Sequence, residues 1–114
     1  WNNIATDVAA RLPALGFVGL SCDPGPPGVV PLMRVDIHVD AIAWHEETRS
    51  KTAEEVLAEL ADARAATAGG PVGLLTHHMV VSEPGWDDLD RVLRLGQDDT
   101  DVVWADAHEV FGTP

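Results

Sequence analysis

The sequence predicts an α/β fold in which parallel strands alternate with helices. Its segments follow the order helix, strand, strand, helix, strand, helix, strand, which is typical of a parallel sheet covered by helices. The almost continuous apolar run at residues 72–75 suits a strand buried on both faces, as is common in such sheets. Apolar residues make up 46% of the 114-residue chain, so a packed core for one modest domain is available.

The N-terminal part is expected to hold a helix and then a short strand. Apolar residues recur at helical spacing over residues 4–15, and Gly16 is a natural stop. Pro13 lies inside this pattern and should kink the helix or end its regular part early. A short strand is predicted at residues 17–21, and a surface loop at residues 22–31, which contain four of the eight prolines.

The middle of the chain predicts a strand, an exposed loop and a helix. Residues 32–44 form the strand template, with apolar and polar residues alternating from Val35 to Asp40, and the charged residues 45–51 follow as the loop. Thr52 and Glu55 have the spacing of a capping box that opens a helix. This helix should stop at Gly69 and Gly70 and bury one apolar face, made of Val56, Leu57, Leu60 and Ala63.

The C-terminal part predicts a strand, a helix, a strand and one last helical turn. The first strand covers residues 71–78, and the helix begins near Pro84, a favourable first helical residue. The second strand covers residues 101–104, and the helical turn covers residues 105–111. The buried face of the helix is expected to carry Trp86, Leu89, Val92 and Leu93.

Charge and composition exclude several classes of partner. Seven Lys and Arg face nineteen Asp and Glu, which gives a formal charge of −12 and a pI near 4.4. Nucleic acids and anionic membranes are bound through Lys and Arg, so neither is expected as a partner. No apolar run reaches the roughly 20 residues of a transmembrane segment. Cys22 is the only cysteine, which excludes a disulfide within the chain and a thiolate metal site.

Candidate functional residues lie where predicted strands end. His77 and His78 end one strand, and Trp44 and His45 end an earlier one. In parallel α/β folds the functional groups gather at the carboxyl ends of the strands. Successive side chains on a strand point to opposite faces, so the two adjacent histidines cannot chelate one ion by themselves. We therefore expect one of them to work in a site and the other to point away.

A rival site is possible within the second predicted strand. Asp36, His38 and Asp40 alternate with apolar residues, so all three are predicted to project from one face of the strand. Two carboxylates and an imidazole could bind a divalent cation. The alternative is that this polar face meets solvent or an ion-pair partner such as Arg34 or Arg49.

Three short motifs resemble those of the NodB-homology polysaccharide deacetylases. The strand end "LLTHH" resembles the last motif of the family, Leu-x-His, with Leu75 and His77 in the two fixed places. The stretch "HVDAIAW" resembles the preceding motif, Asp-x-x-Asp-Trp, with Asp40 and Trp44 matching. The opening "WNN" resembles the end of an earlier Arg-x-Pro-Trp motif at Trp1. Order and spacing of the three motifs agree across essentially the whole chain.

The resemblance implies that residues 1–114 are part of a polysaccharide deacetylase-like catalytic domain, the C-terminal half of a distorted (β/α) barrel. It implies hydrolysis of N- or O-acetyl groups on an acetylated carbohydrate, either a polysaccharide or a glycan precursor. In the family, an Asp and a His-x3-His pair bind a divalent metal, zinc or a similar ion, and a further Asp is the general base. All of these lie in the N-terminal half of the domain. They would precede Trp1, so the chain is expected to be a fragment whose partner is that missing half.

The resemblance also assigns roles within this chain. It implies that His77 is the catalytic acid, which gives a proton to the leaving amine; an imidazole is a natural donor near neutral pH. Trp44 and Leu75 would wall an apolar slot for the acetyl methyl group, and Trp1 would also bind substrate. His78 is expected to support the site by hydrogen bonding.

One departure from the family pattern puts catalysis in question. The second Asp of the Asp-x-x-Asp-Trp motif, which in the family pairs with the acid histidine, is Ala43 here. Asp40 or Asp36 would have to replace it from a different angle. The alternative function is therefore a non-catalytic, deacetylase-like module that binds a glycan or a partner.

Overall fold

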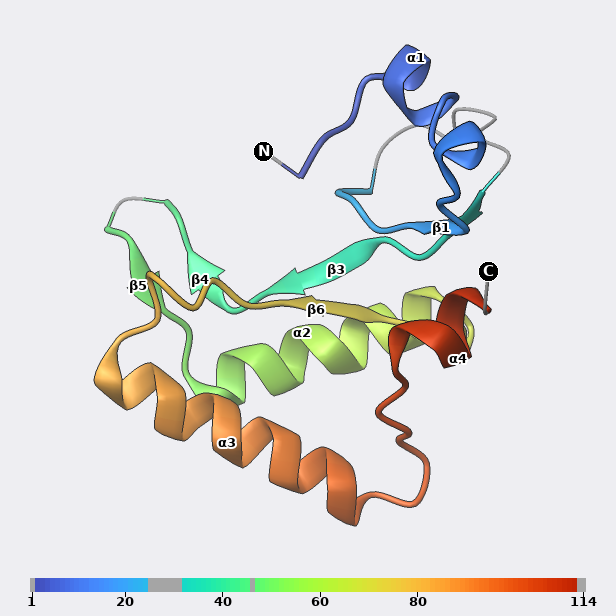
Figure 1. Ribbon diagram of the computed structural model, residues 1–114. Helices are drawn as coiled ribbons and strands as arrows, with labels where there is room; N and C mark the ends of the chain where they lie inside the picture. Colours follow the sequence, from blue (N-terminus) through green and yellow to red (C-terminus); the bar gives the residue numbers. More distant parts are fainter. Residues whose placement is uncertain (1, 25–31, 46, 113–114) are drawn as a thin grey trace.

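The computed structural model describes residues 2–24, 32–45 and 47–112, and these form a mixed α/β fold (Figure 1). Its helices and strands, in chain order, are α1 (Thr6–Ala9), the short 3₁₀ helix η1 (Pro13–Leu15), β1 (Gly19–Leu20), β2 (Met33–Arg34), β3 (Ile37–Asp40), β4 (Ile42–Ala43), β5 (Arg49–Ser50), α2 (Ala53–Ala66), β6 (Gly73–Leu75), α3 (Glu83–Asp98) and α4 (Ala107–Phe111).

The strands are short and pair two by two. β1 pairs with β2 and β3 pairs with β6, both in parallel, whereas β4 and β5 form an antiparallel hairpin. The backbone N–H groups of Val35 and Ile37 donate to the carbonyls of Leu20 and Cys22, which continues the parallel pairing from β2 towards β3. The predicted α/β class with parallel strands is thus confirmed. The described residues form no closed barrel.

The strand predicted at residues 32–44 is broken into β2, β3 and β4. Within β3 the register with β6 also shifts: Ile37 lies opposite Gly73, but Val39 lies opposite the next residue, Leu74. His38 is therefore an extra residue on β3, which interrupts the alternation of faces. The prediction of one uninterrupted polar face through residues 36–40 is wrong for this reason.

Helix α2 forms as predicted, beginning with a capping box. The Thr52 hydroxyl accepts a hydrogen bond from the Glu55 N–H at 3.3 Å, and Glu55 Oε2 accepts one from the Thr52 N–H at 2.8 Å. After the helix, Gly69 adopts a φ of 83°, a left-handed conformation that favours glycine. The predicted face is also correct: the fully buried core of Val39, Ala53, Val56 and Val92 is surrounded by Leu57, Leu60, Ala63 and Leu74.

Helix α3 begins where predicted but buries a narrower face. Ser82 caps it by accepting a hydrogen bond from the Gly85 N–H at 3.2 Å. Its buried residues are Gly85, Leu89 and Val92, a stripe at helical spacing. Trp86 and Leu93 each directly follow a residue of this stripe and are 45% and 44% exposed. The expectation that they pack in the core is therefore wrong.

Two predictions near the chain ends also differ from the structure. The helix predicted over residues 4–15 is limited to α1 and η1, because Pro13 begins a 3₁₀ turn; Gly16 ends that turn with a φ of 86°, as expected. The strand predicted at residues 101–104 does not form. Trp104 instead lies against Gly96 of α3, where an added Cβ would come within 2.7 Å of the indole. The final helical turn, α4, is confirmed.

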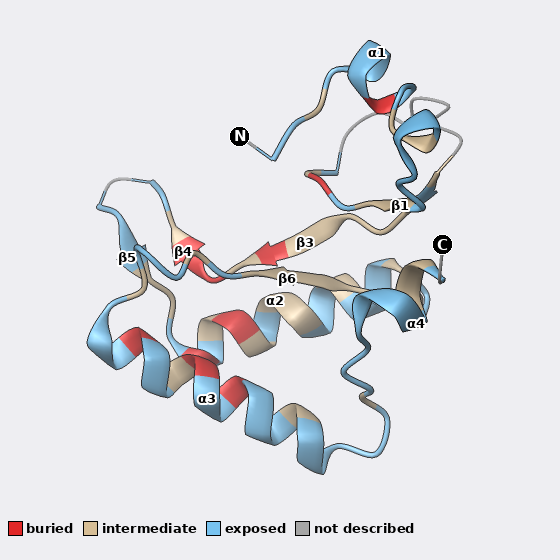
Figure 2. Ribbon diagram, in the orientation of Figure 1, coloured by how far each residue is buried: buried red, intermediate tan, exposed pale blue. Residues whose placement is uncertain are grey.

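The core lies between the β3–β6 pair and the two long helices. Figure 2 shows the buried residues on β3, on β4 and on the facing sides of α2 and α3. The half-buried residues of β6 contradict the expectation of a strand buried on both faces.

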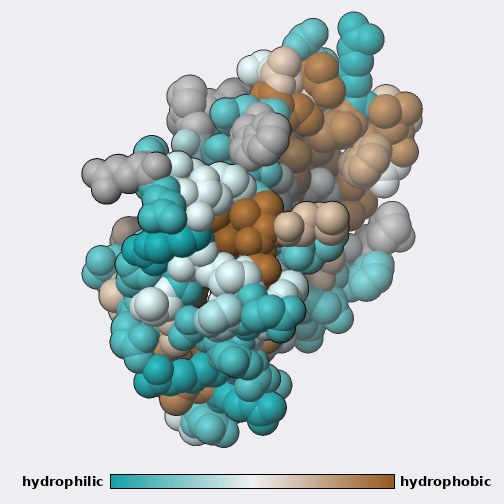
Figure 3. All heavy atoms as spheres, turned by 90° about the vertical axis from the view of Figure 1, so that its left-hand side faces the viewer, coloured by the Kyte–Doolittle hydropathy of each residue, from teal (hydrophilic) through white to brown (hydrophobic). Residues whose placement is uncertain are grey.

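Figure 3 shows apolar surface gathered at the end of the molecule that carries α1. Exposed apolar side chains in this part are Val8, Leu15, Phe17, Val18 and Met33. Within the described ranges, no helix has the length and apolarity to cross a membrane.

Candidate functional site

The candidate site lies at the carboxyl ends of β3 and β6. Asp40 is the last residue of β3 and lies opposite Leu75, the last residue of β6. His77 follows β6 after one intervening residue, Thr76. Because the two strands run parallel, their carboxyl ends meet at one edge and bring Asp40 and His77 together.

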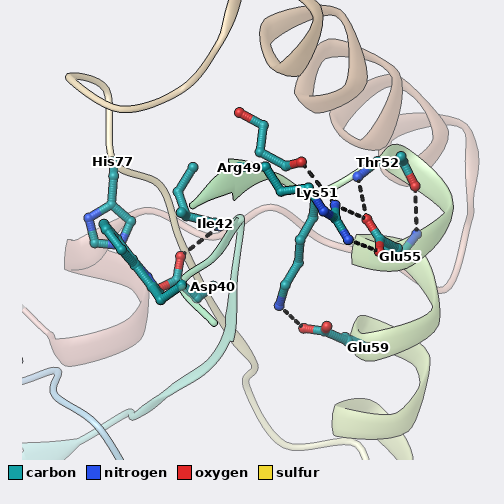
Figure 4. A network of polar contacts seen from close by, with 10 residues as sticks. Asp40, Ile42, Arg49, Lys51, Thr52, Glu55, Glu59 and His77 are labelled. Carbon is teal, nitrogen blue, oxygen red and sulfur yellow. Dashed lines mark hydrogen bonds and ion pairs between the residues drawn. The ribbon is translucent and has the colours of Figure 1, made fainter. Parts of the chain in front are cut away.

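Asp40 and His77 are in direct contact. His77 Nε2 lies 3.1 Å from Asp40 Oδ2, and the two side chains are 19% and 26% exposed (Figure 4). The other carboxylate oxygen, Oδ1, accepts a hydrogen bond from the backbone N–H of Ile42 at 2.8 Å. The carboxylate is thus held by its own chain segment on one side and faces the imidazole on the other.

Trp44 completes the cluster. Its indole Nε1 donates to Asp40 Oδ2 at 2.8 Å, the same oxygen that faces His77. Its ring also meets the His77 ring edge to face, with centroids 5.0 Å apart and planes at 85°. The indole is still 40% exposed. Trp44 therefore contacts both polar residues and presents apolar surface beside them.

The β4–β5 hairpin positions Trp44 and the residues after Asp40. Ile42 lies opposite Ser50 in this hairpin, and the backbone N–H of Lys51 donates to the carbonyl of Ala41 at 2.9 Å. The sequence did not predict the hairpin, because residues 45–51 carry charge and no strand periodicity. Strands of two residues each, such as β4 and β5, are too short to show an alternation of apolar and polar residues in the sequence.

Ion pairs join this hairpin to the start of α2, as Figure 4 shows. The Arg49 guanidinium donates to both carboxylate oxygens of Glu55, at 2.8 and 2.6 Å, and Lys51 Nζ lies 2.7 Å from Glu59 Oε2. The pKa of Glu55 is lowered from 4.5 to about 2. The hydrogen bond from Arg49 is the largest cause, and the hydrogen bond from the Thr52 backbone N–H is the second. The ion pair between Arg49 and Glu55, which joins the hairpin to α2, therefore has both partners charged at neutral pH.

His78 is separated from this cluster. Strand β6 ends at Leu75, so both histidines lie beyond it and the argument from alternating strand faces does not strictly apply. The His77 carbonyl instead accepts hydrogen bonds from Val80 and Val81, which forms a turn. His77 is half-buried in the cluster and His78 is exposed, as are His45 and His108. Trp1 lies outside the described residues.

The rival metal site does not assemble. Asp36 accepts a hydrogen bond from Arg34 Nε, as the ion-pair alternative required, and His38 Nδ1 accepts one from the Gly73 N–H at 3.2 Å. Asp40 faces His77 instead. Among the described residues, no group of three or more His, Cys, Asp or Glu side chains could hold a metal ion.

Cys22 lies beside Asp36 and is 6% exposed. Its Sγ is 3.7 Å from Asp36 Oδ1. Burial raises the pKa of the Cys22 thiol, and the Asp36 charge adds to this, while Arg34 opposes it. The thiol therefore stays protonated at neutral pH, which disfavours a nucleophilic role.

The small size of Gly73 matters for the pairing of β3 with β6. In the structure an added Cβ would lie 2.5 Å from the carbonyl oxygen of Asp36 and 3.1 Å from Ile37 Cα. Gly73 therefore permits close approach of the β3 and β6 backbones, on which the alignment of Asp40 with His77 depends.

Comparisons of the chain with protein-family models, with curated proteins and with solved structures found no match. Any assignment of function therefore depends on the residues and geometry described above.

Proposed function

We propose that this chain is the C-terminal part of a carbohydrate deacetylase that hydrolyses N- or O-acetyl groups on a polysaccharide or glycan precursor. The observation that carries this proposal is the contact between His77 and Asp40 at the carboxyl ends of two parallel strands. Ala43 occupies the place where the family has the carboxylate partner of its acid histidine. Asp40, at the end of β3 and before Ala43 in the chain, supplies such a partner from a different position.

The chemistry of deacetylation suits these two residues. Cleavage of an acetyl amide needs a proton for the leaving amine nitrogen, and a histidine imidazole can hold and release a proton near neutral pH. A neighbouring carboxylate accepts a hydrogen bond from the imidazole and so fixes its direction. In this proposal His77 is the catalytic acid and Asp40 orients it.

Trp44 and Leu75 suit the substrate side of the site. Trp44 presents part of its indole beside the His77 ring, and Leu75 lies opposite Asp40 in the strand register. An aromatic and an aliphatic side chain next to the acid provide apolar surface for an acetyl methyl group. His78 is exposed and is assigned no direct part in catalysis.

The divalent metal of the family does not fit the described part of this chain, which offers no group of three potential ligands. The resemblance places the metal ligands and the general base in an N-terminal half-barrel, and we propose that this half is the partner of residues 1–114. In this proposal His77 donates the proton, Asp40 orients the acid, and Trp44 and Leu75 contact the acetyl group.

The test is acetate release by the complete protein that contains this chain. We expect release from N-acetylated chitooligosaccharides or from O-acetylated xylan, and its loss in the Asp40→Ala variant. Asp36→Asn is the matched control, because Asp36 pairs with Arg34 outside the cluster and should leave most activity in place. Binding of these glycans without any acetate release would overturn the enzymatic proposal and favour the non-catalytic binding module.

A further inference from the structure

The hydrogen bonds around Asp40 determine which His77 nitrogen carries a hydrogen. Asp40 Oδ1 faces the backbone N–H of Ile42, and Oδ2 faces the indole N–H of Trp44, both at 2.8 Å. Backbone amides and indoles can only donate, so both carboxylate oxygens act as acceptors. A carboxylate that accepts two such hydrogen bonds offers no hydrogen of its own.

An ionised Asp40 requires a donor at its third contact, which is with His77 Nε2 at 3.1 Å. Neutral histidine has one N–H donor and one acceptor nitrogen. The hydrogen therefore lies on Nε2, and the lone pair lies on Nδ1. A 180° flip of the ring about Cβ–Cγ would put the carbon Cε1 in the place of Nε2, so this hydrogen bond fixes the ring orientation as well.

The other nitrogen, Nδ1, is open. Within the described part of the chain it makes no hydrogen bond, and no buried side-chain nitrogen or oxygen there lacks a partner. The described residues therefore leave Nδ1 uncovered, although the His77 side chain as a whole is only 19% exposed. An incoming ligand can meet this atom without breaking the contact with Asp40.

We propose that Asp40 and Trp44 are positioning residues that hold His77 as the Nε2–H tautomer, and that Nδ1 is the atom that exchanges a proton with the substrate. The second part rests on the proposed deacetylase function. There, the proton on Nδ1 of the imidazolium passes to the leaving nitrogen as the C–N bond breaks and its electron pair moves to nitrogen. Water supplies the oxygen of the new C–O bond and gives one proton to the general base that the proposed function places in the N-terminal half, and His77 is left neutral with its hydrogen on Nε2.

His38 provides an internal reference for this assignment. Its Nδ1 accepts the Gly73 N–H at 3.2 Å, so a neutral His38 must also carry its hydrogen on Nε2. His38 and His77 are thus expected in the same tautomer for opposite reasons. His38 accepts through Nδ1, whereas His77 donates through Nε2.

The test is a long-range ¹H–¹⁵N correlation spectrum of the full 114-residue chain, labelled with ¹⁵N-histidine, at a pH where the imidazoles are neutral. Each tautomer gives a distinct pattern of cross-peaks. We expect the Nε2–H pattern for His38 and His77, with His77 assigned by its loss in His77→Gln. His78→Gln is the matched control and should remove only one exposed-histidine pattern.

Two variants test the positioning residues. Asp40→Ala should give His77 a mixture of both tautomers while the His38 pattern is unchanged. Trp44→Phe keeps an aromatic ring beside His77 but removes the indole N–H, so it should give a smaller admixture. A wild-type His77 in the Nδ1–H form, or a His77 pattern insensitive to Asp40→Ala, would overturn the inference. The spectra need no activity, so absent acetate release would count against the proposed function alone.

Discussion

The His77 imidazole and the Asp40 carboxylate meet at 3.1 Å although the residues are 37 positions apart in the sequence. Their contact depends on the parallel register of β3 and β6, in which Asp40 lies opposite Leu75. A shift of one residue in either strand would move the carboxylate away from the imidazole. The residues that fix this register are therefore as important for the site as those that form it.

Gly73→Ala should disrupt this register. The new methyl group would lie 2.5 Å from the Asp36 carbonyl oxygen, so the backbones of β3 and β6 would have to separate. We expect a loss of about 1–3 kcal/mol in the free energy of unfolding, the usual cost of forcing extra volume into a packed site. Urea unfolding monitored by circular dichroism measures this loss.

Gly70→Ala is the matched control for Gly73→Ala. At Gly70 the nearest atom to an added Cβ is the Thr67 carbonyl oxygen at 3.2 Å, outside the strand pair. Its cost should be clearly smaller. Equal stability of wild type and Gly73→Ala would show that the close approach of β3 and β6 is not needed.

The ion pair between Arg49 and Glu55 should make folding stability sensitive to acid. Hydrogen bonds from Arg49 and the Thr52 backbone lower the pKa of Glu55 in the folded chain from 4.5 to about 2. Its contribution is therefore fully present above pH 4.5 and is lost as the pH falls towards 2. The urea midpoint of wild type should fall over this window.

Glu55→Gln should flatten that part of the pH profile, because the variant has no carboxylate to protonate. Glu83→Gln is a suitable control, since Glu83 is also an exposed acidic residue in the first turn of a helix. A Glu55→Gln profile parallel to that of wild type between pH 4.5 and 2 would contradict the assigned role of Glu55.

Cys22 should react slowly with alkylating reagents in the folded chain. It is 6% exposed, and burial raises the pKa of its thiol, so both access and the thiolate fraction are reduced at neutral pH. We expect iodoacetamide to modify native Cys22 at least tenfold more slowly than the chain unfolded in urea, as measured by mass spectrometry. Similar rates in the two states would show that Cys22 is accessible and activated.

The chain on its own should self-associate. The N-terminal part exposes several large apolar side chains, with Leu15 at 71% and Phe17 at 54%, and β6 pairs on one edge only within the described residues. Sedimentation velocity should show species larger than the monomer, reduced in the Leu15→Gln/Phe17→Ser variant. Val103→Ser, at an 81% exposed site in another part of the molecule, is the control. A monomer at all concentrations would disprove this prediction.

The sequence predicts elements well where local signals decide the structure. The Thr52–Glu55 capping box and the apolar face of Val56, Leu57, Leu60 and Ala63 specify α2 without help from the rest of the chain, and α2 forms as expected. The segment at residues 101–104 has strand-like composition, but a strand needs a neighbour to pair with. Trp104 packs on Gly96 instead, which no local pattern indicates.

The sequence indicates three residues that the structure brings together, but not how they are arranged. Motif spacing selected Asp40, Trp44 and His77, and the structure brings all three together. Strand alternation, by contrast, predicts Asp36, His38 and Asp40 on one face, which fails because the extra residue at His38 shifts the register. The indole hydrogen bond from Trp44 to Asp40 depends on the hairpin, and so it could not be derived from residue types alone.

The last prediction separates the two adjacent histidines in the complete protein. If His77 gives the proton to the leaving amine, His77→Ala should reduce kcat by roughly 10²- to 10⁴-fold, the usual size of general-acid catalysis. KM should change little, because the interaction is made mainly in the transition state. His78→Ala should cost much less, since His78 is exposed and outside the cluster of Asp40 and Trp44. Steady-state kinetics of acetate release for the two variants measures this difference. An equal loss, or a greater one in His78→Ala, would show that the wrong histidine has been assigned as the acid.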